Sequence, residues 1–185
     1  KKWGIHILNV NTCVSPQNLN ELTELRDLIF DLGVDHWVLR PITSSGRAEG
    51  ADYALNQSQV AELLAFSQSS LEAGFDLTLG GVGFLGPMDS IIYSSPHFPH
   101  SGWNSFYILP NGQIKGFNDD TLPVDGHLLE DDIEELWHSQ FNYYRHPELP
   151  LDCLQCEYFK RCGGGNIPEA HTSLRCTKAL FSAAI

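Results

Sequence analysis

The sequence lacks any long apolar run, and it contains few cationic residues. No stretch of about 18 consecutive apolar residues occurs, so we expect no transmembrane helix. Lysine and arginine together number 11, against 23 aspartate and glutamate residues, and the net charge is −12 at pH 7. General nucleic-acid binding needs a basic surface that neutralises phosphates, so this charge argues against it. The acidic surface fits solubility or, alternatively, a basic peptide partner.

Methionine is also scarce. The sole methionine is Met88, so the sequence has no initiator methionine. The first ten residues, KKWGIHILNV, are too short and too mixed in character to form a signal peptide. We therefore expect a chain that begins inside a longer parent protein.

Cysteines are few, and they are unevenly placed. There are five, an odd number, and four of them follow residue 150. Such clustering favours a metal site in a reducing compartment over a disulfide framework. This usage predicts a cytoplasmic protein.

The first part of the chain alternates between strand and helix patterns. Its 185 residues suit one domain, or one domain with a small appendix. Apolar β-forming runs predict strands at residues 4–10, 36–42 and 75–81. Helical periodicity predicts a helix that ends at Gly33, with an apolar face of leucines, and a second helix at 57–73. The leucines of the first helix are Leu19, Leu22, Leu25, Leu28 and Leu32. This order is typical of parallel β/α units.

The pattern changes after residue 80. Residues 81–103 are rich in Gly, Pro, Ser and His and predict a connecting loop. Two short strands around Pro-Asn-Gly predict a hairpin at 105–118. A short amphipathic helix is expected at 130–139, with acidic residues at its N-terminal end.

The cysteine segment carries the clearest chemistry. Cys153 and Cys156 are separated by two residues, Cys162 follows after five more, and Cys176 lies ten residues beyond Asn166. Four thiolates suit either tetrahedral zinc or a four-iron, four-sulfur cluster, and the spacing does not choose between them. Histidines at 138, 146 and 171 are alternative ligands. The three glycines after Cys162 would let the backbone approach a bulky cluster.

The second half of the chain resembles the SPASM domain of radical S-adenosylmethionine (SAM) enzymes, which modify peptides and proteins. That domain has a hairpin with a PDG-like turn, matched here by residues 110–112, and a following helix, matched by GHLLEDDIEELWHS at 126–139. It closes with Cys-x2-Cys-x5-Cys-x3-Cys and one further cysteine. Asn166 stands at the fourth position of that run.

The first half resembles the late strands and helices of the radical SAM partial barrel, from NVNTCVSPQ at residue 9 to GRAEG at residue 50. The resemblance implies an α/β fold: late β/α units of a partial TIM-type barrel at 1–85, a linker at 86–100, and at 101–185 a small irregular α+β SPASM-like metal-binding domain with a β-hairpin.

The same resemblance suggests residues that face a ligand. Leu39 and Arg40 end the second predicted strand, where the family's barrel lies against the adenosine of the cofactor. Cys13 is expected after the first strand, on the loop side where barrel active sites open. A thiol there could touch substrate, although a lone cysteine is more often inert.

Two departures from the family pattern matter. The Cys-x3-Cys-x2-Cys motif that holds the SAM-cleaving cluster is absent from this chain, as is the family's Gly-Gly-Glu segment, so the chain alone should be inactive. The family also carries two auxiliary clusters. The ligands of the first are missing from the hairpin and from position 166. Those of the second match Cys153, Cys156, Cys162 and Cys176.

The resemblance therefore implies the C-terminal portion of a radical SAM peptide or protein maturase. It would carry one auxiliary [4Fe-4S] cluster for electron transfer or structure, while the parent would hold SAM and a second [4Fe-4S] cluster. The implied partners are a peptide or protein substrate, an electron donor protein and the N-terminal half of the same enzyme. The alternative is a non-catalytic zinc or iron–sulfur module that recognises a peptide or partner.

Overall fold

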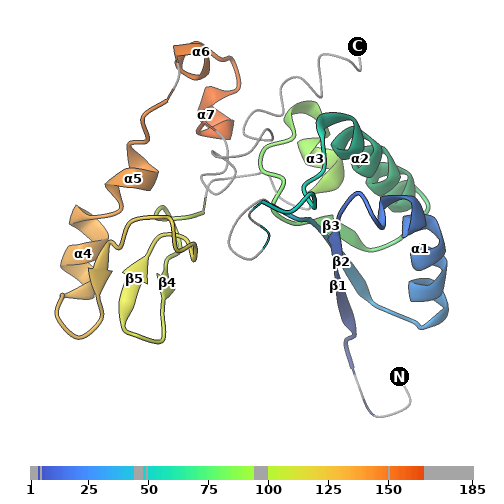
Figure 1. The fold of residues 1–185 in the computed structure, drawn as a ribbon, viewed down its shortest axis with the longest axis horizontal. Helices are drawn as coiled ribbons and strands as arrows, with labels where there is room; N and C mark the ends of the chain where they lie inside the picture. The colour runs from blue at the N-terminus through green and yellow to red at the C-terminus, as the bar shows by residue number, and fades with distance from the viewer. Residues whose placement is uncertain are drawn as a thin grey trace.

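The computed structural model describes residues 4, 6–43, 48, 50–93, 100–149 and 151–164. It contains a parallel three-stranded sheet in the first half of the chain and an antiparallel three-stranded sheet in the second (Figure 1). The predicted α/β class, with parallel strands followed by a small hairpin-containing part, is confirmed at this level.

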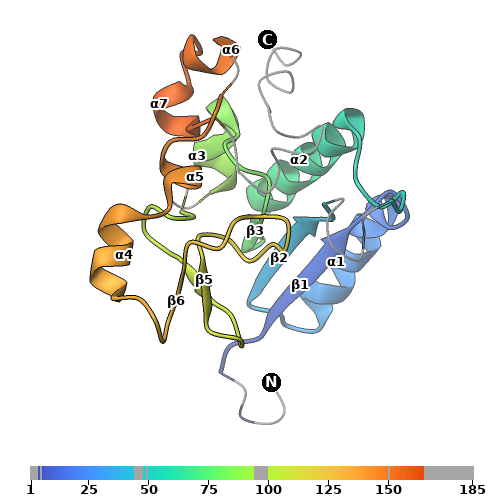
Figure 2. The ribbon, with the colours of Figure 1, turned by 60° about the vertical axis from the view of Figure 1, so that its left-hand side comes forward.

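The strands of the parallel sheet lie side by side in chain order: β1 (Asn9–Val14), β2 (His36–Pro41) and β3 (Leu77–Leu79). A 3-10 turn, η1 (Leu19–Glu21), leads into α1 (Leu22–Asp31), which joins β1 to β2. The helix α2 (Gln57–Glu72) joins β2 to β3. Both helices cover the same face of the sheet (Figures 1 and 2).

The first strand lies later in the chain than predicted. The apolar run at 4–10 favoured a strand there, but β1 is Asn9–Val14 and Ile7 is 71% exposed. Among the described elements, helices cover one face of the sheet, so a strand is marked by period-two alternation rather than by a continuous apolar run. Cys13 consequently lies within β1 and not in the loop after it.

The two helices of this unit follow their predictions to different degrees. In α1, Leu22 and Ile29 are buried seven residues apart on one face, whereas Leu28 and Leu32 of the predicted face are exposed. In α2, the Asn56 side chain accepts a hydrogen bond from the Gln59 N–H at 3.0 Å. The Gln59 side chain accepts one from the Asn56 N–H at 3.0 Å. This reciprocal cap fixes the start of α2.

The core of this unit lies between the sheet and the two helices. Trp37 is its largest side chain; its ring meets Phe66 edge-on at 5.9 Å and its Nε1–H donates to Thr12 Oγ1 at 2.9 Å. The same apolar cluster continues through Ile92, in α3 (Asp89–Ile92), which follows the 3-10 turn η3 (Gly86–Met88). Part of the segment 86–100, predicted as a linker, thus packs with the first unit.

The second unit is small. Its strands are β4 (Tyr107–Ile108), β5 (Gln113–Lys115) and β6 (Gly126–His127), in the order β4-β5-β6. Its helices are short: α4 (Ile133–Ser139), α5 (Asn142–Arg145), α6 (Leu151–Leu154) and α7 (Phe159–Cys162). A second apolar cluster holds the strands to α4 and α5. Its buried members are Ile114, Leu122, Leu136, Phe141 and Tyr144.

The predicted hairpin and acidic helix start are both confirmed. Gly112 closes the hairpin turn at a φ of 86°, a backbone conformation that favours glycine. Asp132 caps α4 by accepting a hydrogen bond from the Glu135 N–H at 3.0 Å. Within the described parts of the chain, no helix is long and apolar enough to cross a membrane.

Candidate functional site

The parallel sheet has one polar, exposed face. Side chains alternate along each strand, so residues that do not contact α1 and α2 point to the opposite face. Cross-strand partners on that face are Asn9 with His36, Asn11 with Val38, Cys13 with Arg40, and Val38 with Thr78. Parallel sheets are normally covered on both faces. A polar uncovered face is therefore a candidate surface for a ligand or for another part of a longer protein.

Side-chain hydrogen bonds tie the strands together across this face. His36 Nδ1 lies 2.8 Å from Asp76 Oδ1, which joins β2 to the residue before β3. Arg40 Nε reaches Asn11 Oδ1 at 3.5 Å, at the opposite end of the strands. The face thus carries an amide–guanidinium pair that joins the middle of β1 to the carboxyl end of β2. These groups suit anionic or peptide-like ligands.

Arg40 lies flat against the chain that follows β3. A Cβ added to Gly80 would lie 2.9 Å from Arg40 Nη1 and 3.2 Å from its Cγ. The absence of a side chain at Gly80 therefore leaves the space that the arginine side chain occupies. Gly80 is in turn held to β2, because its N–H donates to the Leu39 carbonyl at 2.8 Å.

The two residues suggested as cofactor contacts point to opposite faces of β2. Arg40 is exposed on the polar face, whereas Leu39 has 0% exposure and belongs to the core beside the helices. The Leu39 side chain is therefore not on the polar face. The sequence patterns did not identify four polar residues of this face: Asn9, Asn11, His36 and Asp76. The alternation in NVNTCV was the signal that could have found the first two.

The cysteine segment is a pair of short helical turns. Cys153 lies in α6, Cys156 follows it, and Cys162 ends α7; all three are partly buried. The Cys156 N–H donates to the Cys153 carbonyl at 3.1 Å, which forms a tight turn between the two residues. Gly163 and Gly164 then take positive φ values of 63° and 93°. A Cβ added at Gly164 would clash with the Leu149 side chain, so Gly164, after the cysteines, packs against Leu149, before them.

The structure describes three of the four predicted metal ligands, Cys153, Cys156 and Cys162. Cys176 and Asn166 lie outside the described residues, as does His171. Among the residues that are described, no three His, Cys, Asp or Glu side chains are grouped as a metal site. The donor chemistry fits a thiolate-bound metal, since three partly buried cysteines and two glycines with positive φ occur within 12 residues, from 153 to 164.

Buried and partly buried charged and polar side chains hold the backbone of the second unit together through hydrogen bonds. Lys115 is only 4% exposed, and its ammonium donates to the carbonyls of Asp119 at 2.9 Å and Leu122 at 3.0 Å. Asp125 accepts from the Gly116 N–H at 2.8 Å, while burial raises the pKa of its carboxyl above 3.8. Burial also raises the pKa of Tyr144 to about 12; its hydroxyl accepts from the Phe117 N–H at 3.0 Å.

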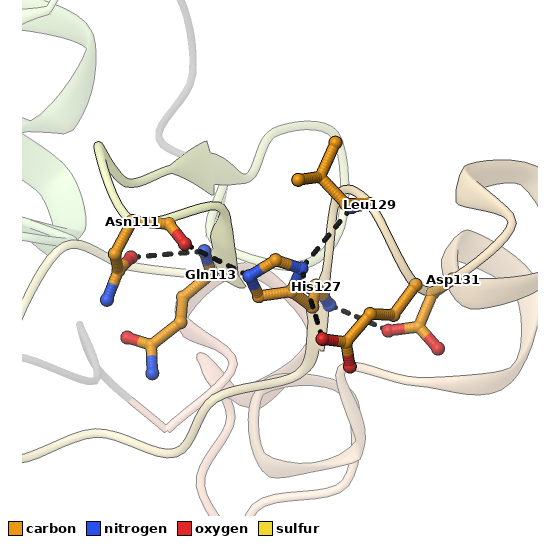
Figure 3. A network of polar contacts seen from close by, with 6 residues as sticks. Asn111, Gln113, His127, Leu129 and Asp131 are labelled. Carbon is orange, nitrogen blue, oxygen red and sulfur yellow. Dashed lines mark hydrogen bonds and ion pairs between the residues drawn. The ribbon is translucent and has the colours of Figure 1, made fainter.

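His127 joins the hairpin turn to the segment before α4 (Figure 3). Its Nδ1 accepts from the Leu129 N–H at 3.3 Å, so Nε2 carries the proton and donates to the Asn111 carbonyl at 3.0 Å. The backbone N–H of His127 donates to the Asp131 carboxylate at 2.7 Å. The imidazole covers Gly112, where a Cβ would lie 2.7 Å from the ring. These contacts give His127 a structural role.

Solved structures share this fold over most of the chain. Streptococcus suis SuiB has a TM-score of 0.64 at 15% identity, over 91% of this chain and 44% of SuiB. Native anSMEcpe with bound AdoMet and Kp18Cys peptide has a TM-score of 0.63 at 15% identity, over 95% of this chain and 55% of that one. SuiB bound to precursor peptide SuiA has a TM-score of 0.62 at 14% identity, over 88% and 41% of the two chains.

These structures are of radical SAM peptide maturases with SPASM domains, so the resemblance inferred from the sequence is confirmed at the level of the fold. The chain spans about half the length of the structures that it matches. No protein-family model matches the sequence, and no curated protein matches it.

Proposed function

We propose that this chain is the C-terminal portion of a radical SAM enzyme that modifies a peptide or protein. The observation that carries the proposal is the shared fold, which extends over both units. Among the proteins that share it are anSMEcpe with bound AdoMet and peptide, and SuiB bound to its precursor peptide. The division into barrel units at 1–85, a linker at 86–100 and a SPASM-like domain at 101–185 belongs to this proposal.

We assign the metal site to Cys153, Cys156, Cys162 and Cys176. A [4Fe-4S] cluster held by these four thiolates would supply electron transfer or structural support, and it would have no open position for a substrate. The partly buried state of the three described cysteines supports this assignment, because burial limits access of water and oxidants to bound sulfur ligands. The cysteine usage also supports a cytoplasmic parent.

The polar face of the sheet has the second role in this proposal. In the parent, Arg40 and Asn11 would lie toward the bound cofactor or substrate, where the guanidinium would bind an anionic group and the amide would orient it. Leu39 would contribute through its backbone, since its side chain is in the core. SAM, the first cluster, an electron donor and the N-terminal half would all come from outside this chain.

The ligand assignment is tested by metal content in paired variants. Wild-type chain purified without oxygen should hold about four irons, as expected for one cubane cluster. Cys176→Ala should lose most of that iron, and Cys13→Ala, on the polar face, is the matched control that should keep it. Full iron retention in Cys176→Ala would contradict the assignment.

A second candidate function is a non-catalytic binding module. The cysteine segment is the observation that favours it, because thiolates at this spacing suit zinc as well as an iron–sulfur cluster. One zinc and no iron in the purified protein, together with a parent gene lacking Cys-x3-Cys-x2-Cys, would establish the module instead.

A further inference from the structure

The cysteine segment is docked on the first unit through two side chains of α7 and the turn before it. The ring of Tyr158 lies 5.6 Å from that of Phe84, and the Arg161 guanidinium carbon lies 5.6 Å from the centre of the same Phe84 ring. Figure 2 shows α7 beside α3, as these contacts require. Phe84 is buried, so the contact is part of the packed structure.

An acidic group completes the docking site. Asp89 begins α3 and is 1% exposed; its Oδ1 accepts from the Leu85 N–H at 3.1 Å. Its Oδ2 faces Arg161 Nη2 at 3.8 Å. A buried carboxylate needs hydrogen bonds and a compensating charge. Arg161 supplies the charge while its plane covers Phe84, a combination that lysine does not reproduce.

The docking site lies directly after β3. The segment from Val82 to Asp89 follows Gly80, against which the Arg40 side chain rests. Tyr93 holds this segment from the other end, because its hydroxyl donates to the Gly83 carbonyl at 2.9 Å. A continuous set of contacts therefore runs from α7 to the end of the polar face that carries Arg40.

The position of the two docking side chains in the sequence is the central point. Tyr158 and Arg161 both lie between Cys156 and Cys162. A metal bound by these two cysteines would restrain the loop between them, and with it the side chains that contact Phe84 and Asp89. Loss of the metal would remove that restraint.

We propose that Tyr158 and Arg161 are positioning residues that couple occupancy of the metal site to the order of residues 82–93, at the edge of the polar face. The proposal rests on the metal site assigned above. Metal binding orders the segment after β3 through Arg161, and this segment in turn supports Gly80 beneath Arg40.

Hydrogen exchange of the full chain, with metal and after anaerobic chelation, tests the coupling. Metal content is measured first in each sample. The amides of Leu85, Met88 and Tyr93 donate hydrogen bonds within this segment. They should exchange about two- to fivefold faster without metal, the change expected for loss of one cation–π contact at a partly exposed arginine.

Variants separate the coupling from general destabilisation. Arg161→Ala should keep its metal, yet exchange at residues 84–93 should be fast with or without it, and Arg161→Lys should restore only part of the protection. Lys160→Ala removes an exposed cation from the same helix and should respond to metal as wild type does.

Two outcomes overturn the coupling, and they differ. If metal-loaded wild type and metal-loaded Arg161→Ala exchange at the same rate over residues 84–93, the coupling is wrong. The proposed metal site would be unaffected by that result. A chain that binds no metal under any condition would overturn the proposed metal site and the coupling together.

Discussion

The two units of this chain are stabilised in different ways. The first buries a broad apolar cluster between a parallel sheet and two helices. Among its described residues, the second has five buried apolar side chains in its core, and it relies on charged side chains that bind backbone carbonyls. Small units bury too little apolar surface to be stable on packing alone. Polar contacts therefore stabilise the second unit in the way that apolar packing stabilises the first.

Arg145 shows this reliance most clearly. Its guanidinium donates to the carbonyls of Gly102 at 2.8 Å, Trp137 at 2.6 Å and Gln140 at 3.1 Å. It also lies over the Trp137 ring at 4.9 Å. One side chain thereby joins the start of the second unit to α4 and to the turn that follows it.

The largest effect is expected from the apolar core of the first unit. Leu39→Ala should lower the free energy of unfolding by about 2–5 kcal/mol, because the site is fully buried and leaves a cavity. Leu28→Ala, at an exposed position of α1, is the matched control and should cost less than about 1 kcal/mol. Urea denaturation measures both, and equal losses would contradict this view of the core.

The next effect concerns the buried ammonium of the second unit. Lys115→Met keeps the length of the side chain but removes both hydrogen bonds to carbonyls, so it should cost roughly 1.5–3 kcal/mol. Near-UV circular dichroism should report the loss in the second unit, through Trp137 and its neighbours. Lys160→Met, at an exposed position, should change neither the free energy of unfolding nor the near-UV spectrum. A Lys115→Met variant as stable as wild type would contradict the contrast between the two units.

A pH effect should also be confined to the second unit. Burial raises the pKa of Asp125 in the folded protein, so its contribution to stability is present below its unfolded pKa of about 3.8 and is lost as pH rises through the folded value. Asp125→Asn should therefore gain stability relative to wild type as pH rises from 3 to 7. The exposed Asp120→Asn is the control, and matching pH profiles for the two variants would refute the effect.

The smallest stability effect should come from the polar face. Arg40→Ala should change the free energy of unfolding by no more than about 0.5 kcal/mol, since the side chain is exposed. In the proposed parent enzyme, the same change should weaken binding of AdoMet or peptide substrate, measured by calorimetry. A large loss of stability with unchanged binding would make Arg40 a structural residue.

The sequence predicted the elements of the first unit better than their faces. Helical periodicity at 57–73 predicted α2, in which Val60, Leu63 and Leu64 are buried, whereas the Asn56 cap was not predicted. The apolar run at 4–10 misplaced β1, because a strand with one polar face shows alternation instead. The predicted apolar face of α1 is wrong at Leu28 and Leu32, which are exposed. This segment has more leucines than the face that packs against the sheet can bury.

The second unit was predictable only in its turn and its acidic helix start. Lys115 and Arg145 appear in the sequence as ordinary surface cations, and only the fold brings backbone carbonyls around them. Tyr158 and Arg161 were likewise overlooked between the cysteines, because their partners Phe84 and Asp89 lie about 70 residues earlier in the chain. Contacts at such separation carry no local pattern.

The iron and sulfide content of the intact parent protein, with its visible spectrum, tests the central claim most directly. We predict about eight irons and eight sulfides, from one cluster outside this chain and one within it, with the broad absorption of [4Fe-4S] centres. Cys176→Ala should reduce both counts by about half. Zinc without iron, or an iron count that Cys176→Ala leaves unchanged, would contradict the claim.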